Sequence, residues 1–158
     1  MVTGLFFDDI RTGQVFESAP HVVPRSEIVE FARSYDPNMF HLDPAAARAI
    51  GLTDVIASGF HTLSLSFRLF FDIHPWDDAI LPSPGIDKVR FLKPVYPGDS
   101  LFVRATVIET TVSRSRPDRG IVRVSHETLN ATSREPVLSA EAMHRLRRRD
   151  GFTRNIEA

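Results

Sequence analysis

Cysteine is missing from this chain, and so is any long uninterrupted apolar run. Without cysteine there can be no disulfide framework, thiolate metal site or cysteine nucleophile. The most apolar segment, residues 59–73, is shorter than the roughly 20 residues that span a bilayer, and His61 and Arg68 interrupt it. The first residues, MVTGLFFDDIRTG, lack a basic stretch ahead of an apolar one, so no secretory signal is expected. We therefore expect a cytoplasmic protein with no membrane partner.

An excess of one charge is also missing. The formal net charge is −1, charged residues make up 25% of the chain and hydrophobic residues 42%. This balance gives no general attraction to nucleic acid, so no nucleic-acid partner is expected. Two arginine-rich stretches, residues 113–120 and 145–151, are interpreted as a solvated hairpin loop and a solvated strand end.

The helical signals come early in the chain. At 158 residues we expect one domain over residues 1–158. A segment that opens at Pro24 and Ser26 has apolar residues at helical spacing, and Pro37 should end it because a residue before proline is pushed out of the helical region. Asp43 is expected to cap a second helix that starts at Pro44 and runs to Ile50 before Gly51.

A third helix is predicted from Gly59 to about Phe71, and its apolar residues do not keep to one stripe. A helix that is apolar nearly all round is expected to be buried. From Gly85 onward the pattern changes to a period of two, which is typical of strands. One strand face contains Leu101, Val103, Ala105 and Val107, and another contains Leu138, Ala140, Ala142 and Leu146. Residues 121–129 form a further strand, and Val89 with Phe91 marks a shorter one. The predicted architecture is α+β, an antiparallel β-sheet curled around one central apolar helix in a hotdog-like arrangement.

The loop between the first two helices, DPNMFHLDP at residues 36–44, contains residues suited to acid–base chemistry. Turn chemistry explains Asp, Asn and Pro there, but it does not require a histidine. On one helix Asp36 and His41 would point about 140° apart, whereas across a loop broken by proline they can converge. A carboxylate and an imidazole that share one water form an acid–base pair near neutral pH. Asn38 could supply a polar contact within this loop.

The start of the third helix, IASGFHTL, is the second candidate feature. Ser58 can act as an N-cap, and Gly59 can make room for close packing. Unsatisfied N–H groups at a helix start also attract negative charge, and a glycine there allows a ligand to approach closely. Both interpretations can hold together, because an oxyanion site is a helix start that a ligand can reach.

These residues together resemble a known family. The run D-P-N-M-F-H-L-D, the alanine-rich helix after it, I-A-S-G at the start of the apolar helix and F-L-K-P-V-Y-P-G-D-S-L further on are similar to the MaoC-like dehydratases, the (R)-specific enoyl-CoA hydratases of the hotdog superfamily. The resemblance runs from about residue 26 to residue 107 and more loosely to the C-terminus. It implies Asp36 and His41 as the catalytic pair, Asn38 as the asparagine of the motif and Gly59 as the glycine that starts the central helix. Asn38 and Gly59, with Ser58 at the same helix start, are the expected substrate-binding residues. The chain departs from the family at Tyr35, where glycine is common, at Met39, where proline is common, and at Ser58, where histidine is common.

The resemblance implies reversible hydration of a trans-2-enoyl-CoA to an (R)-3-hydroxyacyl-CoA, with no metal and no cofactor, in a homodimer or a multiple of dimers. His21, His61 and His74 lack metal-ligand spacing with His41. Two alternatives stay open at this point: a hotdog acyl-CoA thioesterase and a non-catalytic acyl-CoA-binding protein. A thioesterase would need a carboxylate aimed from the central helix, which contains none, with only Asp72 after it. One loop arginine, at position 114, 116 or 119, could meet the CoA phosphates.

Overall fold

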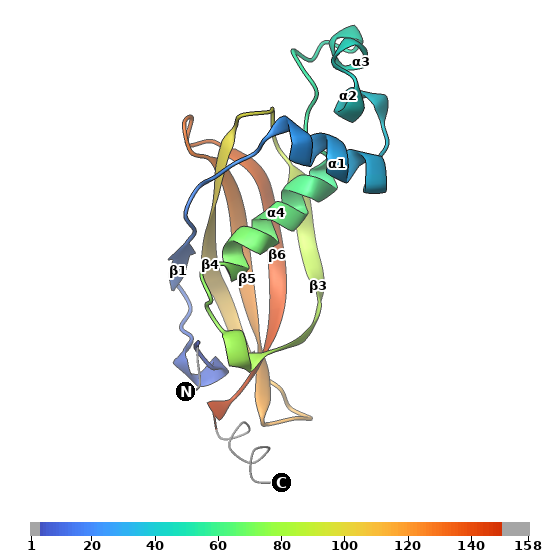
Figure 1. Cartoon of the computed structure of the whole chain (residues 1–158). Coiled ribbons are helices and arrows are strands. Elements are labelled where there is room, and N and C mark those ends of the chain that lie inside the picture. The colour runs from blue at the N-terminus through green and yellow to red at the C-terminus, as the bar shows by residue number, and fades with distance from the viewer. Residues whose placement is uncertain (1–3, 150–158) are drawn as a thin grey trace.

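The fold is a six-stranded antiparallel sheet with one long helix lying across it (Figure 1). The computed structural model describes residues 4–149. The strands are β1 (Val15–Glu17), β2 (His21–Val22), β3 (Ile80–Phe91), β4 (Ser100–Val112), β5 (Arg119–Asn130) and β6 (Pro136–Arg147). Their order is β1-β4-β5-β6-β3, and β2 pairs with β4. The four helices are α1 (Arg25–Tyr35), α2 (Met39–Leu42), α3 (Pro44–Ala49) and α4 (Gly59–Phe71), with two 3-10 turns at Phe7–Asp9 and Asp77–Ala79. The predicted α+β hotdog class is confirmed.

The predicted helix boundaries agree with the structure for local reasons. Helix α1 ends at Tyr35, two residues before Pro37. The Asp43 side chain accepts a hydrogen bond from the Ala45 N–H at 2.8 Å, and Pro44 is the first residue of α3. Gly51 follows with φ of +90°, a left-handed conformation that glycine adopts without strain.

Strand β3 is much longer than the short strand predicted around Val89 and Phe91. It begins at Ile80 and includes Pro82 and Pro84. The prolines hid it in the sequence, because proline removes a donor from a ladder and argues against a central strand. Strand β3 is the last strand of the sheet, and an edge strand tolerates proline.

Helix α4 is buried on one side only, so the prediction of an all-round buried helix is wrong. Its N-terminal Phe60 is 61% exposed, and Phe71 at its other end is also exposed. Its buried residues include polar ones, such as Thr62 and Ser66. Leu69 and Phe70 pack into the core, whereas the face that carries Phe60, Ser64, Arg68 and Phe71 is exposed among residues 4–149.

The core below α4 contains two buried histidines that strand alternation did not single out. His126 of β5 and His144 of β6 have their Nε2 atoms 3.5 Å apart, so one ring donates to the other. The ring of Phe67 stacks on His126, with centroids 5.0 Å apart. Burial lowers the pKa of His126 to about 4, and burial with the neighbouring His126 lowers the pKa of His144 to about 3.

We predict that acid destabilises the fold through this histidine pair. Both pKa values lie below the ordinary histidine value of 6.5, so the unfolded chain binds more protons as pH falls below 6.5. The free energy of unfolding is therefore unaffected by protonation of the pair above pH 6.5. It falls progressively as the pH approaches the folded pKa values, by an amount on the order of a few kcal/mol. Urea unfolding between pH 7 and pH 4 should show a smaller loss in the His126→Leu/His144→Leu variant than in the parent. Equal losses would contradict the prediction, and if the variant fails to fold, titration of the parent's imidazoles by NMR gives the same test.

Candidate active site

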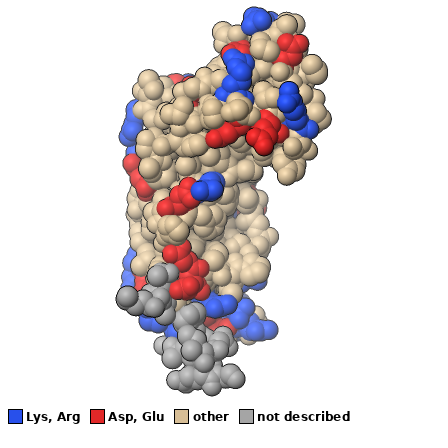
Figure 2. Space-filling view, viewed as in Figure 1, with Lys and Arg blue, Asp and Glu red and all other residues tan. Residues whose placement is uncertain are grey.

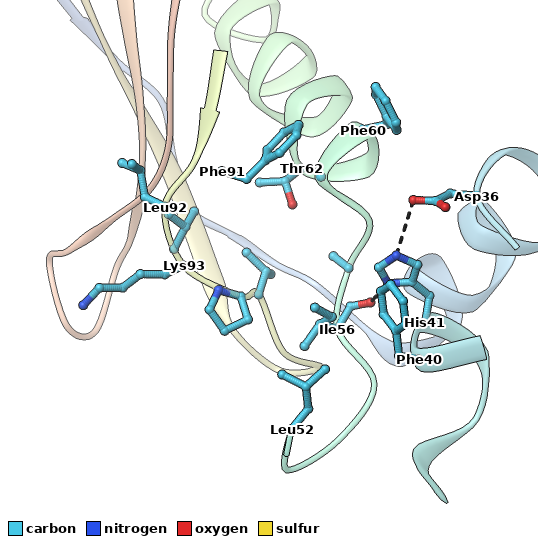
Figure 3. A pocket seen from close by; sticks show the side chains of 15 residues that line it. Asp36, Phe40, His41, Leu52, Ile56, Phe60, Thr62, Phe91, Leu92 and Lys93 are labelled. Atoms are coloured by element: carbon cyan, nitrogen blue, oxygen red, sulfur yellow. Dashed lines mark hydrogen bonds and ion pairs between the residues drawn. The ribbon is translucent and has the colours of Figure 1, made fainter. Parts of the chain in front are cut away.

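Asp36 and His41 come together because proline breaks the chain between them. The Asp36 N–H still donates to the Ala32 carbonyl, which makes Asp36 the C-cap of α1. The chain then turns, and His41 lies on the short helix α2, which the sequence had suggested only as loop. The His41 Nε2 and Asp36 Oδ2 atoms are 3.3 Å apart (Figure 3).

The orientation of the His41 ring is set by a backbone carbonyl. His41 Nδ1 lies 2.7 Å from the carbonyl oxygen of Ile56. A carbonyl oxygen can only accept, so Nδ1 carries a proton, and Nε2 is the nitrogen that faces Asp36. His41 is only 4% exposed, which holds the ring in place.

The Asp36 carboxylate is held by two further side chains. The Ser58 hydroxyl donates to Oδ2 at 2.7 Å, and the Asn38 amide donates to Oδ1 at 2.5 Å. The hydrogen bond from Ser58 has the largest effect on the pKa of Asp36 and lowers it, while burial has the next largest effect and raises it. The interactions with His41 and the hydrogen bond from Asn38 add to the effect of Ser58, so the pKa of Asp36 lies below its usual value. The carboxylate is therefore charged at neutral pH.

A pocket of about 510 Å³ opens beside this pair. Asp36 and His41 form one wall, and Gly59 and Thr62 of α4 form another. The remaining lining is mainly apolar and consists of Phe40, Leu52, Ile56, Ala57, Phe60, Phe91, Leu92, Lys93, Pro94, Val95 and Val137 (Figure 3). A carboxylate and an imidazole at the edge of an apolar cleft are suited to a reaction on a small organic substrate.

Ser58 caps the start of α4 as predicted, and the ring of Phe91 lies next to Gly59, which was not predicted. The Ser58 Oγ accepts from the Phe60 N–H at 3.1 Å. Gly59 lines the pocket, and a Cβ built on it would lie 2.7 Å from the Phe91 ring. The absence of a side chain at Gly59 therefore lets the Phe91 ring lie in this position.

The sequence-predicted site residues fall into two groups. Asp36, His41 and Gly59 line the pocket. Asn38 and Ser58 touch the Asp36 carboxylate instead, and Ser58 is completely buried. The expectation that Asn38 makes a polar contact within its loop is confirmed, whereas the structure gives Ser58 a partner that sequence spacing did not indicate.

Sequence reasoning missed the contributions of Phe91 and of the Ile56 carbonyl. Phe91 belongs to the F-L-K-P-V segment, so its motif was noticed, but nothing local indicated that its ring reaches Gly59. A backbone carbonyl has no sequence signature. Within residues 4–149, no group of three or more His, Asp or Glu side chains is placed to hold a metal ion, and no helix is long and apolar enough to cross a membrane.

The sheet with a helix lying across it defines a hotdog protein, and comparisons with known proteins agree. The MaoC like domain family matches residues 9–130, and the chain belongs to this family. It is 33% identical to the uncharacterized protein YdeM of Bacillus subtilis over 78% of this chain and 86% of that protein. The crystal structure of the MaoC-like dehydratase from Rhodospirillum rubrum has a TM-score of 0.86 and 39% identity, covering 92% of this chain and 99% of that one. The R-hydratase PhaJ1 from Pseudomonas aeruginosa has a TM-score of 0.72 and 25% identity, covering 89% and 84%.

Proposed function

We propose that the chain catalyses reversible hydration of a trans-2-enoyl-CoA to an (R)-3-hydroxyacyl-CoA. The observation that carries the proposal is the 3.3 Å approach of His41 Nε2 to Asp36 Oδ2 at the wall of the pocket. A water in contact with both groups would be polarised by a base and a carboxylate together. The likeness to an R-hydratase supports the reaction type and its stereochemistry.

We assign different roles to His41 and Asp36, because Nδ1 of His41 is protonated and Nε2 is the atom that faces Asp36. His41 Nε2 takes one proton from the water while the water oxygen bonds to C3 of the substrate. The Asp36 anion stabilises the imidazolium that forms, since opposite charges favour each other in a partly buried site. The imidazolium then returns a proton to C2 on the same face, so that water has added across the double bond.

A hydrogen-bond donor is needed to stabilise the negative charge that develops on the thioester oxygen during the reaction. The Gly59 N–H is at the N-terminus of α4, where the helix dipole favours negative charge. Within the described part of the chain, no residue accepts a hydrogen bond from this N–H. We assign it to the thioester oxygen, which places the enolate-like intermediate between Gly59 and the Asp36–His41 pair.

An assay with crotonyl-CoA tests this function against its alternatives. Hydration should remove the enoyl absorbance without releasing free thiol. Release of thiol would show a thioesterase, and a bound but unchanged substrate would show a binding protein. Helix α4 contains no carboxylate, and Asp72 directly after it lies at the end far from Gly59 in an ion pair with Arg68, which favours hydration over hydrolysis.

We propose that the working unit is a dimer joined along β3 and α4. Strand β3 has 12 residues and, within residues 4–149, pairs with β6 alone, so its other edge can pair with a second copy. Exposed apolar side chains lie along this side, namely Phe60, Phe71, Ile86, Phe91 and Leu92. Viewed from the side of α4, the middle of the molecule shows mainly uncharged residues (Figure 2).

A charge placed on the β3 edge should separate the dimer. Light scattering is expected to give twice the 17.8 kDa chain mass for the parent and the single mass for Ile86→Lys. Val112→Lys is the matched control, because Val112 is similarly exposed but lies on β4, away from this edge. A parent of 17.8 kDa with full activity would contradict the proposal.

A further inference from the structure

The position of Asp36 in the fold is electrostatically unfavourable. It is the C-cap of the 11-residue helix α1, where the helix dipole is negative. A carboxylate at this end is repelled, which raises its pKa. The pKa of Asp36 is nevertheless lowered, and the largest cause is the hydrogen bond from Ser58. Ser58, at the start of α4, therefore offsets the unfavourable effect of the α1 dipole on Asp36.

The direction of both hydrogen bonds of the Ser58 hydroxyl can be deduced. The Phe60 N–H is a donor, so Ser58 Oγ accepts from it at 3.1 Å. The hydroxyl has a single hydrogen, which is then directed to Asp36 Oδ2 at 2.7 Å. The Ser58 carbonyl is held as well, because it accepts from the Thr62 N–H at 3.0 Å and from the Thr62 hydroxyl at 3.2 Å. Ser58 is completely buried, so water does not compete for these bonds.

We infer that Ser58 is a positioning residue of the reaction: it links the positive end of α4 to the Asp36 carboxylate and keeps that carboxylate aimed at His41. The inference rests on the proposed function. An N-cap needs only an acceptor, and Asp or Asn would cap as well as Ser. The donated hydrogen bond to Asp36 is the additional feature, and an aspartate at position 58 would repel Asp36.

The N–H groups at the start of α4 would act on both sides of the reaction, through Ser58 on the carboxylate and through Gly59 on the thioester oxygen. Asp36 would remain an anion throughout turnover, and His41 Nε2 would be the only atom of the pair that gains and loses a proton.

The test compares Ser58→Ala with two other variants. Asp43→Ala removes the cap of α3 without touching Asp36, so it controls for the loss of an N-cap. Ser58→Cys keeps nearly the same side-chain size but replaces a strong hydrogen-bond donor with a weak one. It can therefore show the effect of losing the hydrogen bond to Asp36 if Ser58→Ala does not fold. Carboxyl titration of Asp36 by ¹³C NMR measures its pKa without depending on activity.

We expect the Asp36 pKa to rise in Ser58→Ala and, less, in Ser58→Cys, and to stay unchanged in Asp43→Ala. With crotonyl-CoA, kcat of Ser58→Ala should fall between about 10- and 100-fold, because the carboxylate is no longer aligned, while KM changes little. An unchanged Asp36 pKa in folded Ser58→Ala or Ser58→Cys would overturn the inference. An inactive parent with the expected pKa changes would refute the proposed reaction and leave the electrostatic role of Ser58 standing.

Discussion

The Asp36→Asn protein is expected to fold normally and to hydrate crotonyl-CoA at least about 10²-fold more slowly than the parent. Asparagine keeps the shape of the side chain and can still accept from the Ser58 hydroxyl. It loses the negative charge that stabilises the His41 imidazolium. The loss should therefore appear in kcat, and the melting temperature should change little.

The second half of this prediction concerns His41. The ring is buried and bonded to the Ile56 carbonyl, so His41→Ala would leave a cavity and an unsatisfied acceptor. His41→Gln can still donate and is the better test. The double variant should be scarcely slower than either single one, because groups that act as a unit are not additive.

Activity and thermal unfolding should be measured side by side on these variants. Glu30→Gln is a matched control, since it removes one carboxylate charge from an exposed position on α1. If the folded Asp36→Asn protein hydrates crotonyl-CoA at the full rate, the proposed mechanism is wrong. A multiplicative loss in the double variant would show that the two side chains act independently.

Gly59→Ala is expected to give the second large effect, a loss of hydratase activity on the order of 10²-fold. A methyl group at position 59 would crowd the N–H that we assign to the thioester oxygen. Stability should fall only slightly, because the atoms that the methyl meets are the outer end of the Phe91 ring, and this side chain is 55% exposed and can shift. Alanine also has the higher helix propensity.

The Phe91→Ala background separates two explanations of that loss. With the ring removed, the new methyl no longer meets Phe91. If the glycine serves the thioester oxygen, Gly59→Ala should reduce kcat/KM as much in this background as in the parent. Recovery of activity in the double variant would instead show that the glycine serves only the Phe91 ring, and the oxyanion assignment would be wrong.

Local sequence signals determined most of the elements. Proline at position 37, the Asp43–Pro44 cap and the Gly51 stop define helices through interactions within a few residues, which spacing alone can show. Alternation along β4 placed Leu101 and Val103 on one buried face for the same reason. Strand β3 was underestimated because its prolines are tolerated only at a sheet edge, and edge position is a property of the whole sheet.

The family and the residue types of the candidate pair could be predicted from the sequence, since the Asp36–His41 spacing and the distance to Gly59 are visible in one chain. Which atoms meet could not be predicted: His41 Nδ1 contacts the Ile56 carbonyl, Ser58 contacts Asp36, and the Phe91 ring lies against Gly59. Each of these contacts joins separate elements, and its geometry follows from how helices and sheet pack together. Periodicity and spacing report on a residue's own helix or strand, whereas hydrogen-bond direction and charge state depend on neighbours that only the folded chain supplies.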